Sequence, residues 1–128
     1  MSSFPITVQT TLEHEVKDSN DDIKTIKTTI ICKRYDDKIL VIISQGDIMG
    51  TMMEGFMIDH DDNSKTFSSV TLLGRRDDVL LLVYLKQLVE FFNKSQNISV
   101  LLGINLLYEE RNIFQSVISF IKQSCSTW

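Results

Sequence analysis

The chain has 128 residues, of which 43% are hydrophobic and 23% charged, and its formal net charge is −4. This length is typical of one domain around one hydrophobic core, so we expect a single domain over residues 1–128. The acidic balance argues against nucleic acids and anionic membranes as partners, because both require a basic surface. Two cysteines are too few for a disulfide framework.

The sequence also indicates where the protein works. Its N-terminus has no basic segment followed by an apolar one, so no secretory signal is visible. Its unbroken apolar runs, such as residues 39–43 and 79–85, are far shorter than the roughly 20 residues that span a bilayer. We therefore expect a cytoplasmic protein that does not enter membranes and keeps Cys32 and Cys125 reduced.

Five segments in the first half of the chain have the composition of β-strands. Residues 6–16 and 23–35 are rich in Ile and Thr, and polar stretches that favour turns separate the segments. The other three segments are residues 38–45, 51–58 and 66–73. The apolar run of residues 38–45 is typical of a strand buried on both faces. Gly46 and Gly50 then predict a hairpin turn with positive φ.

The periodicity changes after Gly74. Asp77 or Asp78 can cap a helix, because a carboxylate there accepts the free N–H groups of the first turn. The apolar residues between Leu80 and Phe92 cover an arc of about 200° on a helical wheel, so this helix must contact more than one neighbour. Residues 98–104 predict a sixth strand, and a final amphipathic helix is expected from about Glu109 to Ser124.

The elements therefore follow the order βββββαβα. Strands that are joined by short turns must be antiparallel. Two helices can cover one face of such a sheet. We predict an α+β domain with an antiparallel sheet of about six strands and two helices on one face.

The second face of this sheet lacks a cover. Residues 39–43 and 98–104 have the pattern of burial on both faces, yet two helices cover only one. Either long neighbouring side chains shield the second face, or it packs on a partner chain. Methionines near the fourth strand favour the partner, because they adapt to irregular surfaces. The candidate protein-interface residues are Ile42, Met49, Met52, Met53 and Phe56.

The most ligand-like cluster is the acidic turn at residues 59–63, which contains His60. An EF-hand loop that began at Asp59 would need Gly at its sixth position and Glu at its twelfth. Those positions hold Ser64 and Val70. We therefore interpret these residues as a solvated turn.

No other constellation predicts catalysis. Glu13 and Glu15 flank His14 on a predicted strand, so alternation places them on the face opposite His14. Two histidines and two cysteines cannot form a three-His or a four-Cys zinc site. The chain has no P-loop, dinucleotide-binding glycine motif or nucleophile elbow. We expect no catalytic, metal or cofactor-binding site, and a protein that is not an enzyme.

Five pieces of the second part of the chain carry a family resemblance. Residues 39–51 read ILVIISQGDIMGT, and residues 71–74 read TLLG. They are followed by an acidic pair, the helical segment VLLLVYLKQLVEFF, the strand SVLLGINL and a final helix that ends near Cys125 and Trp128. In order and spacing, these pieces resemble the proteasome assembly chaperone 3 family over residues 38–128. The first 37 residues match only in strand character, Val79 lies where many relatives have Pro, and the acidic turn 59–63 is particular to this chain.

The resemblance implies a specific function. A family member pairs with a related assembly chaperone, as a heterodimer or a homodimer, and scaffolds the α-subunit ring of the 20S proteasome. It is released before the proteasome matures, and it uses no nucleotide or metal. Two alternatives remain open from the residues alone. The first is a generic dimeric adaptor of a cytosolic complex, and the second is a small enzyme that uses His60 and its aspartates.

Overall fold

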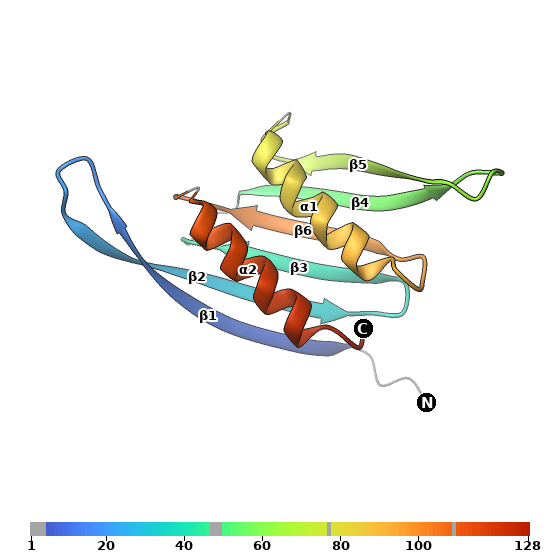
Figure 1. The fold of residues 1–128 in the computed structure, drawn as a ribbon, viewed down its shortest axis with the longest axis horizontal. Helices are drawn as coiled ribbons and strands as arrows, with labels where there is room; N and C mark the ends of the chain where they lie inside the picture. Colours follow the sequence, from blue (N-terminus) through green and yellow to red (C-terminus); the bar gives the residue numbers. More distant parts are fainter. Residues whose placement is uncertain (1–4, 47–49, 77, 109) are drawn as a thin grey trace.

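The computed structural model describes residues 5–46, 50–76, 78–108 and 110–128, and its elements follow the predicted order. Figure 1 shows one curved sheet with both helices side by side across it. The elements in chain order are β1 (Ile6–Lys17), β2 (Ile23–Arg34), β3 (Lys38–Ser44), β4 (Thr51–Asp59), β5 (Lys65–Leu73), α1 (Val79–Phe92), β6 (Ser99–Asn105) and α2 (Arg111–Ser124).

The polar stretches between the outer strands form the expected turns. Between β1 and β2, Asp18 Oδ1 accepts hydrogen bonds from the N–H groups of Asn20 (2.9 Å) and Asp22 (3.0 Å), and Asp21 has φ 62°. Between β4 and β5, Asn63 has φ 68°. Asp and Asn tolerate this left-handed conformation, which explains why these residues can reverse the chain there.

The sheet has the strand order β1-β2-β3-β6-β4-β5. Four of its neighbouring pairs are antiparallel, but β3 and β6 are parallel. The α+β class, the six strands and the two helices on one face are confirmed. The prediction of a wholly antiparallel sheet is wrong at one pair, because β6 lies between β3 and β4. Those two strands still run in opposite directions, as their short connection requires.

The predicted hairpin at Gly46 and Gly50 is therefore also wrong, because the strands on either side of it are not neighbours. Gly46 does not have positive φ, whereas Gly74 has φ 96°. Gly50 is needed for a different reason. A Cβ atom at this position would collide with the carbonyl oxygen of Ile104 and lie 2.9 Å from the Cα of Asn105. Glycine lets the chain pass close to the end of β6.

The helix α1 has the predicted kind of N-cap. Asp78 Oδ1 accepts hydrogen bonds from the N–H groups of Leu80 (3.1 Å) and Leu81 (3.3 Å), which would otherwise have no partner. The alternative cap, Asp77, lies outside the described residues. As its wide apolar arc predicts, α1 contacts β4, β6 and α2.

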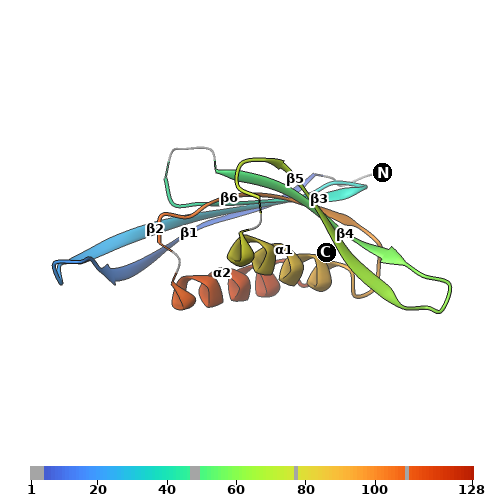
Figure 2. The same cartoon turned by 90° about the horizontal axis from the view of Figure 1, so that it is seen from above.

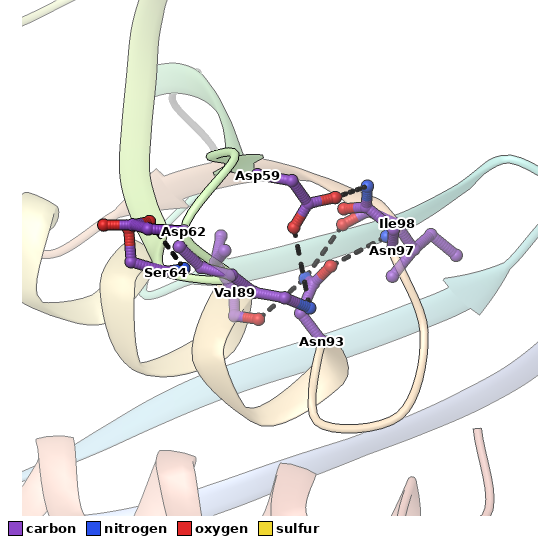
Figure 3. Close-up of polar contacts among 8 residues, drawn as sticks. Asp59, Asp62, Ser64, Val89, Asn93, Asn97 and Ile98 are labelled. Carbon is purple, nitrogen blue, oxygen red and sulfur yellow. Dashed lines mark hydrogen bonds and ion pairs between the residues drawn. The ribbon is translucent and has the colours of Figure 1, made fainter.

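A buried asparagine joins the end of α1 to the start of β6, as Figure 3 shows. Asn93 Nδ2 donates to the carbonyl oxygens of Val89 (2.8 Å) and Ile98 (2.9 Å), and its Oδ1 accepts from Ile98 N–H (2.8 Å). These three hydrogen bonds give partners to the amide nitrogen and the oxygen of the buried Asn93 side chain, so its burial leaves no polar group of that side chain unpaired. They hold β6 at a fixed distance from the helix that precedes it.

The core lies between the helices and one face of the sheet, and Figure 2 shows both helices on the same side of the sheet. In β3 and in β6, every second residue is buried. The buried residues of these two strands are Ile39, Val41, Ile43, Val100, Leu102 and Ile104, each at most 3% exposed. They pack against α1 and α2, whose buried residues complete one cluster. The fold is thus two layers around one core.

Candidate interaction surface

The face of the sheet turned away from the helices carries apolar residues on its four central strands. We define the open face as the surface formed by the apolar residues of these strands that alternate with the buried ones and are themselves partly buried. They are Ile31, Leu40, Ile42, Met52, Phe56, Leu101 and Gly103. All of them are intermediate in exposure, and Figure 2 shows no helix on their side of the sheet.

Strand register places four residues of the open face in one row. Ile42 is opposite Gly103 and also opposite Ile31, and Gly103 is opposite Met52 on its other side. The row continues to Leu73 on β5, which is 53% exposed. The neighbouring side chains shield each other partly, which explains their intermediate exposure. A row of apolar residues across four central strands, in which Gly103 alone lacks a side chain, is nevertheless costly to leave in water.

Charged residues lie at the ends of the next row. Leu40 is opposite Leu101, and Leu101 is opposite Glu54. On the other side, Leu40 is opposite Lys33. The open face therefore has an apolar centre with a basic residue on one side and an acidic residue on the other. An apolar centre within a polar rim is the usual composition of a protein–protein interface.

The structure places three of the five candidate interface residues on the open face: Ile42, Met52 and Phe56. Met53 does not belong there, because its side chain is 2% exposed and lies in the core. Adjacent residues of a strand point to opposite faces, so Met52 and Met53 cannot both face a partner. Met49 lies outside the described residues.

Sequence reasoning did not name the other members of the open face, which are Ile31, Leu40, Leu101 and Gly103. The alternation of side-chain direction along β3 was a usable signal for Leu40, once Ile42 had been assigned to the open face. Ile31 and Leu101 lie on other strands, so their face follows from the pairing of those strands with β3. Gly103 could not be assigned in this way, because a glycine has no side chain to orient. Its position follows only from the register with Ile42 and Met52.

A hollow of about 330 Å³ lies beside Gly103. Its walls include Ile42 and Met52, and it extends to Ser44 and Asn105 at the ends of β3 and β6. The wall surface is mostly apolar. An apolar hollow of this kind suits an aliphatic or aromatic side chain better than a charged one.

The acidic turn makes local contacts, some of which Figure 3 shows. Asp62 accepts a hydrogen bond from Ser64 N–H at 3.0 Å, and bonds from the Ser64 side chain and backbone lower the pKa of the Asp62 carboxyl. Asp59 accepts from Asn97 Nδ2 at 3.2 Å and pairs with Lys65 at 3.9 Å. These carboxylates are therefore engaged in holding the turn and its neighbours.

Among the described residues, neither histidine takes part in a group of three possible metal ligands. His60 Nε2 is 2.6 Å from Thr66 Oγ1 across the β4–β5 hairpin. His14 faces the helix side of β1 while Glu13 and Glu15 are exposed, as alternation predicts. Within residues 5–46, 50–76, 78–108 and 110–128, no three His, Cys, Asp or Glu side chains come together as metal ligands.

Both cysteines are free and buried, as expected for small apolar residues. Cys32 lies on the helix side of β2, and Cys125 follows the last residue of α2. A hydrogen bond with the Cys125 thiol, together with burial, raises the pKa of Cys32 far above its ordinary value. Cys32 is therefore a neutral thiol at physiological pH, which is typical of a packing residue rather than of a nucleophile.

Neither α1 nor α2 has both the length and the apolar character that crossing a bilayer requires, and the rest of the described chain contains no other candidate. The two longest apolar runs of the chain, residues 39–43 and 79–85, belong to β3 and to α1. The helix α1 has fourteen residues and packs on the sheet.

Known proteins resemble this chain in sequence and in fold. A family model described as proteasome assembly chaperone 3 matches residues 41–124, which is more than half of the chain. The proteasome assembly chaperone 3 of Bos taurus is 27% identical over 106 residues, which are 80% of this chain and 85% of that protein. The predicted family resemblance is thus confirmed.

A solved structure shares the fold. It is described as the crystal structure of a novel chaperone complex for yeast 20S proteasome assembly, and it aligns with a TM-score of 0.66. The alignment covers 91% of this chain and 97% of that one at 15% sequence identity. At this identity the likeness establishes a common arrangement of strands and helices.

Proposed function

Because this chain belongs to the proteasome assembly chaperone 3 family, it is a chaperone of proteasome assembly, and we propose that it acts by binding proteins through the open face. One observation carries the proposal: four central strands present apolar residues on a face that no described part of the chain covers. Exposed apolar surface that is continuous across several strands is typical of an interaction site. Catalysis is not required for this work, and we propose that the protein is not an enzyme.

The partner that we propose for the open face is a related assembly chaperone. The pair would be a heterodimer, or a homodimer in which two copies of this chain use the same face. The structural relative is described as a chaperone complex, which supports a partner of this kind. The apolar side chains around Ile42 would be buried on association, which would stabilise the pair. Lys33 and Glu54 at the border of the open face favour one orientation of the partner.

We propose that the client of this pair is the set of α-subunits of the 20S proteasome, bound in the cytoplasm while they assemble into a ring. A chaperone of this kind must bind the intermediate more tightly than the finished particle. Binding a surface that a later subunit covers achieves this difference without any cofactor, since the incoming subunit displaces the chaperone. The family assignment and the description of the yeast relative support this client.

The substitution Ile42→Asp tests the open face. A carboxylate in the apolar centre would have to lose its water on association, so we expect the purified chain or chaperone pair to dissociate into monomers. Analytical ultracentrifugation measures the mass of the species. Thr25→Asp is the matched control, because Thr25 is exposed on the same side of the sheet, in the β1–β2 hairpin. It should leave association unchanged.

Two outcomes would count against this use of the open face. The first is an Ile42→Asp protein that keeps its native mass. The second is a combination of two results. Ile42→Asp loses the circular-dichroism spectrum of the folded chain, while a second variant, Met52→Lys, still sediments with the mass of the unmodified dimer or chaperone pair. In that second case Ile42 would belong to the core of the monomer, and a charge on the open face would not disturb binding.

The client is tested in the native cells. We expect a tagged chain to co-purify with proteasome α-subunits and a second small chaperone, and without mature proteasomes, when the eluate is identified by mass spectrometry. The Ile42→Asp chain should lose the second chaperone. Recovery of an unrelated complex would contradict the proposed client and would favour a generic adaptor.

A further inference from the structure

Gly103 occupies a position in the sheet that glycine normally disfavours. It lies within β6, a central strand, with neighbouring strands on both sides. A glycine there loses more conformational freedom on folding than any other residue and offers no side chain to its neighbours. A glycine in a strand interior therefore calls for a structural reason, and close approach of another group is a common one.

Two other glycines, Gly55 and Gly74, have such a reason within the chain itself. A Cβ atom on Gly55 would lie 2.7 Å from Val89 Cγ2 and 2.9 Å from Leu85 Cγ. A Cβ atom on Gly74 would lie 2.7 Å from the Cα of Thr51, and Gly74 also has φ 96°. At each of these positions the fold of the monomer demands the absence of a side chain.

Gly103 differs from both. The nearest heavy atoms to a Cβ built on it are Ile42 Cγ1 and Met52 Cε, each at 3.8 Å, which is ordinary van der Waals contact. Its φ is not positive. Among the described residues, nothing requires a glycine at this position. The space above Gly103 is instead part of the hollow between Ile42 and Met52.

We propose that Gly103 keeps this hollow open for one bulky apolar side chain of the bound partner, a Leu, Met or Phe, which inserts between Ile42 and Met52. The inference rests on the proposed function, since it assigns an anchor site within the open face. The chemistry of the occupant follows from the walls: Ile42 and Met52 are apolar and offer no charge to pair with.

The position of the hollow supports the same occupant. Buried pockets near the centre of an interface, filled by one large apolar side chain, contribute most of the binding free energy in many complexes. Across the strands, Gly103 is the middle residue of the row that runs from Ile31 through Ile42 and Met52 to Leu73. A side chain that entered here would touch residues of three strands at once. Substituting Gly103 should therefore affect binding strongly and folding weakly.

The test is a series of side chains at Gly103, made in the full chain. Gly103→Leu fills the hollow, so the partner's side chain could no longer enter it. We expect the dissociation constant of the dimer or chaperone pair to rise roughly 10- to 100-fold, because both side chains would compete for the same space. Gly103→Ala adds one methyl group and should raise the dissociation constant only a few-fold. Sedimentation equilibrium measures self-association, and titration calorimetry measures binding to the chaperone that co-purifies.

The control Thr25→Leu adds the same bulk on the same side of the sheet, away from the hollow, and should bind as the unmodified chain does. Thermal unfolding of each variant, measured at concentrations where the chain is monomeric, separates binding from folding. We expect both Gly103 variants to unfold at the temperature of the unmodified chain or above it, because the monomer has room for the added atoms.

The outcomes distinguish this inference from the proposed function. Native affinity in Gly103→Leu together with dissociation in Ile42→Asp would overturn the anchor site and leave the open face as the interface. Native affinity in both variants would overturn both proposals. A marked fall in the unfolding temperature of monomeric Gly103→Leu would also overturn the anchor site, because the hollow would then be needed by the monomer itself.

Discussion

The two faces of β6 carry residues of the same kind in different surroundings. Val100, Leu102 and Ile104 point toward the helices and are at most 3% exposed. Leu101 points to the open face and is only partly buried, although it is the same residue type as its neighbour Leu102. The difference shows that apolar character alone does not identify the core. The covered face stabilises the monomer, and we propose that the open face is reserved for association.

The largest effect expected from this comparison is that of Leu102→Ala. Leu102 is 0% exposed, so truncation should leave a cavity and lower the free energy of unfolding by about 2–5 kcal/mol. Leu101→Ala removes the same atoms from the adjacent position, yet it should lower the unfolding free energy of the monomer by only about 1 kcal/mol or less. Denaturant unfolding at a concentration where the chain is monomeric measures both values.

Association should respond in the opposite order. Leu101→Ala should weaken the dimer or chaperone pair, because it removes apolar surface from the open face. Leu102→Ala should weaken association only to the extent that it lowers the fraction of folded chain. Equal losses of unfolding free energy in the two variants would mean that both faces of β6 belong to the monomer core, and the distinction between the faces would fail.

A second comparison uses two glycines of the same sheet. Gly55→Ala places a methyl group against Val89 and Leu85 at 2.7 and 2.9 Å, so α1 must shift or the side chains must leave their preferred rotamers. We expect this overpacking to lower the free energy of unfolding by about 1–3 kcal/mol. Gly103→Ala meets no such contact and should be neutral or stabilising by roughly 0.5–1 kcal/mol, since alanine reduces the freedom of the unfolded chain.

Thermal unfolding by differential scanning calorimetry, again on monomeric protein, checks the two alanine variants side by side. The informative quantity is the sign of the difference rather than its size. If Gly103→Ala destabilises the chain as much as Gly55→Ala does, then the open face is packed as tightly as the covered one. The open face would then offer no space to a partner.

Local features of the sequence predicted much of this fold. Strand-forming composition and polar turns located the strands, and the change of period after Gly74 located α1. The acidic pair Asp77 and Asp78 predicted a carboxylate cap, which the structure has at Asp78. Each of these signals depends on residues that are close together in the sequence. Short-range sterics and hydrogen bonding are sufficient to generate them.

Features that depend on long-range pairing could not be predicted in this way. The insertion of β6 between β3 and β4 brings Ile42 next to Gly103, two residues that are far apart in the sequence. No local pattern records which strands become neighbours. The wrong face of Met53 has a different, local reason: Met52 and Met53 are neighbours on β4, and alternation along the strand puts them on opposite faces although both are methionines.

The smallest expected effect lies outside both faces, in the turn between β1 and β2. Hydrogen bonds from the backbone N–H groups of Asn20 and Asp22, and the nearby Lys24, lower the pKa of Asp18 below its ordinary value of 3.8. A lowered folded-state pKa stabilises the fold above the unfolded pKa, and this stabilisation is lost as the pH falls through the folded pKa. Asp18→Asn should therefore reduce the fall in unfolding temperature between about pH 5 and pH 2. Since Asp18 contributes to neither face, association of Asp18→Asn at neutral pH should equal that of the unmodified chain. A change in association would show that the β1–β2 turn also contacts the partner, and the interface would then extend beyond the open face.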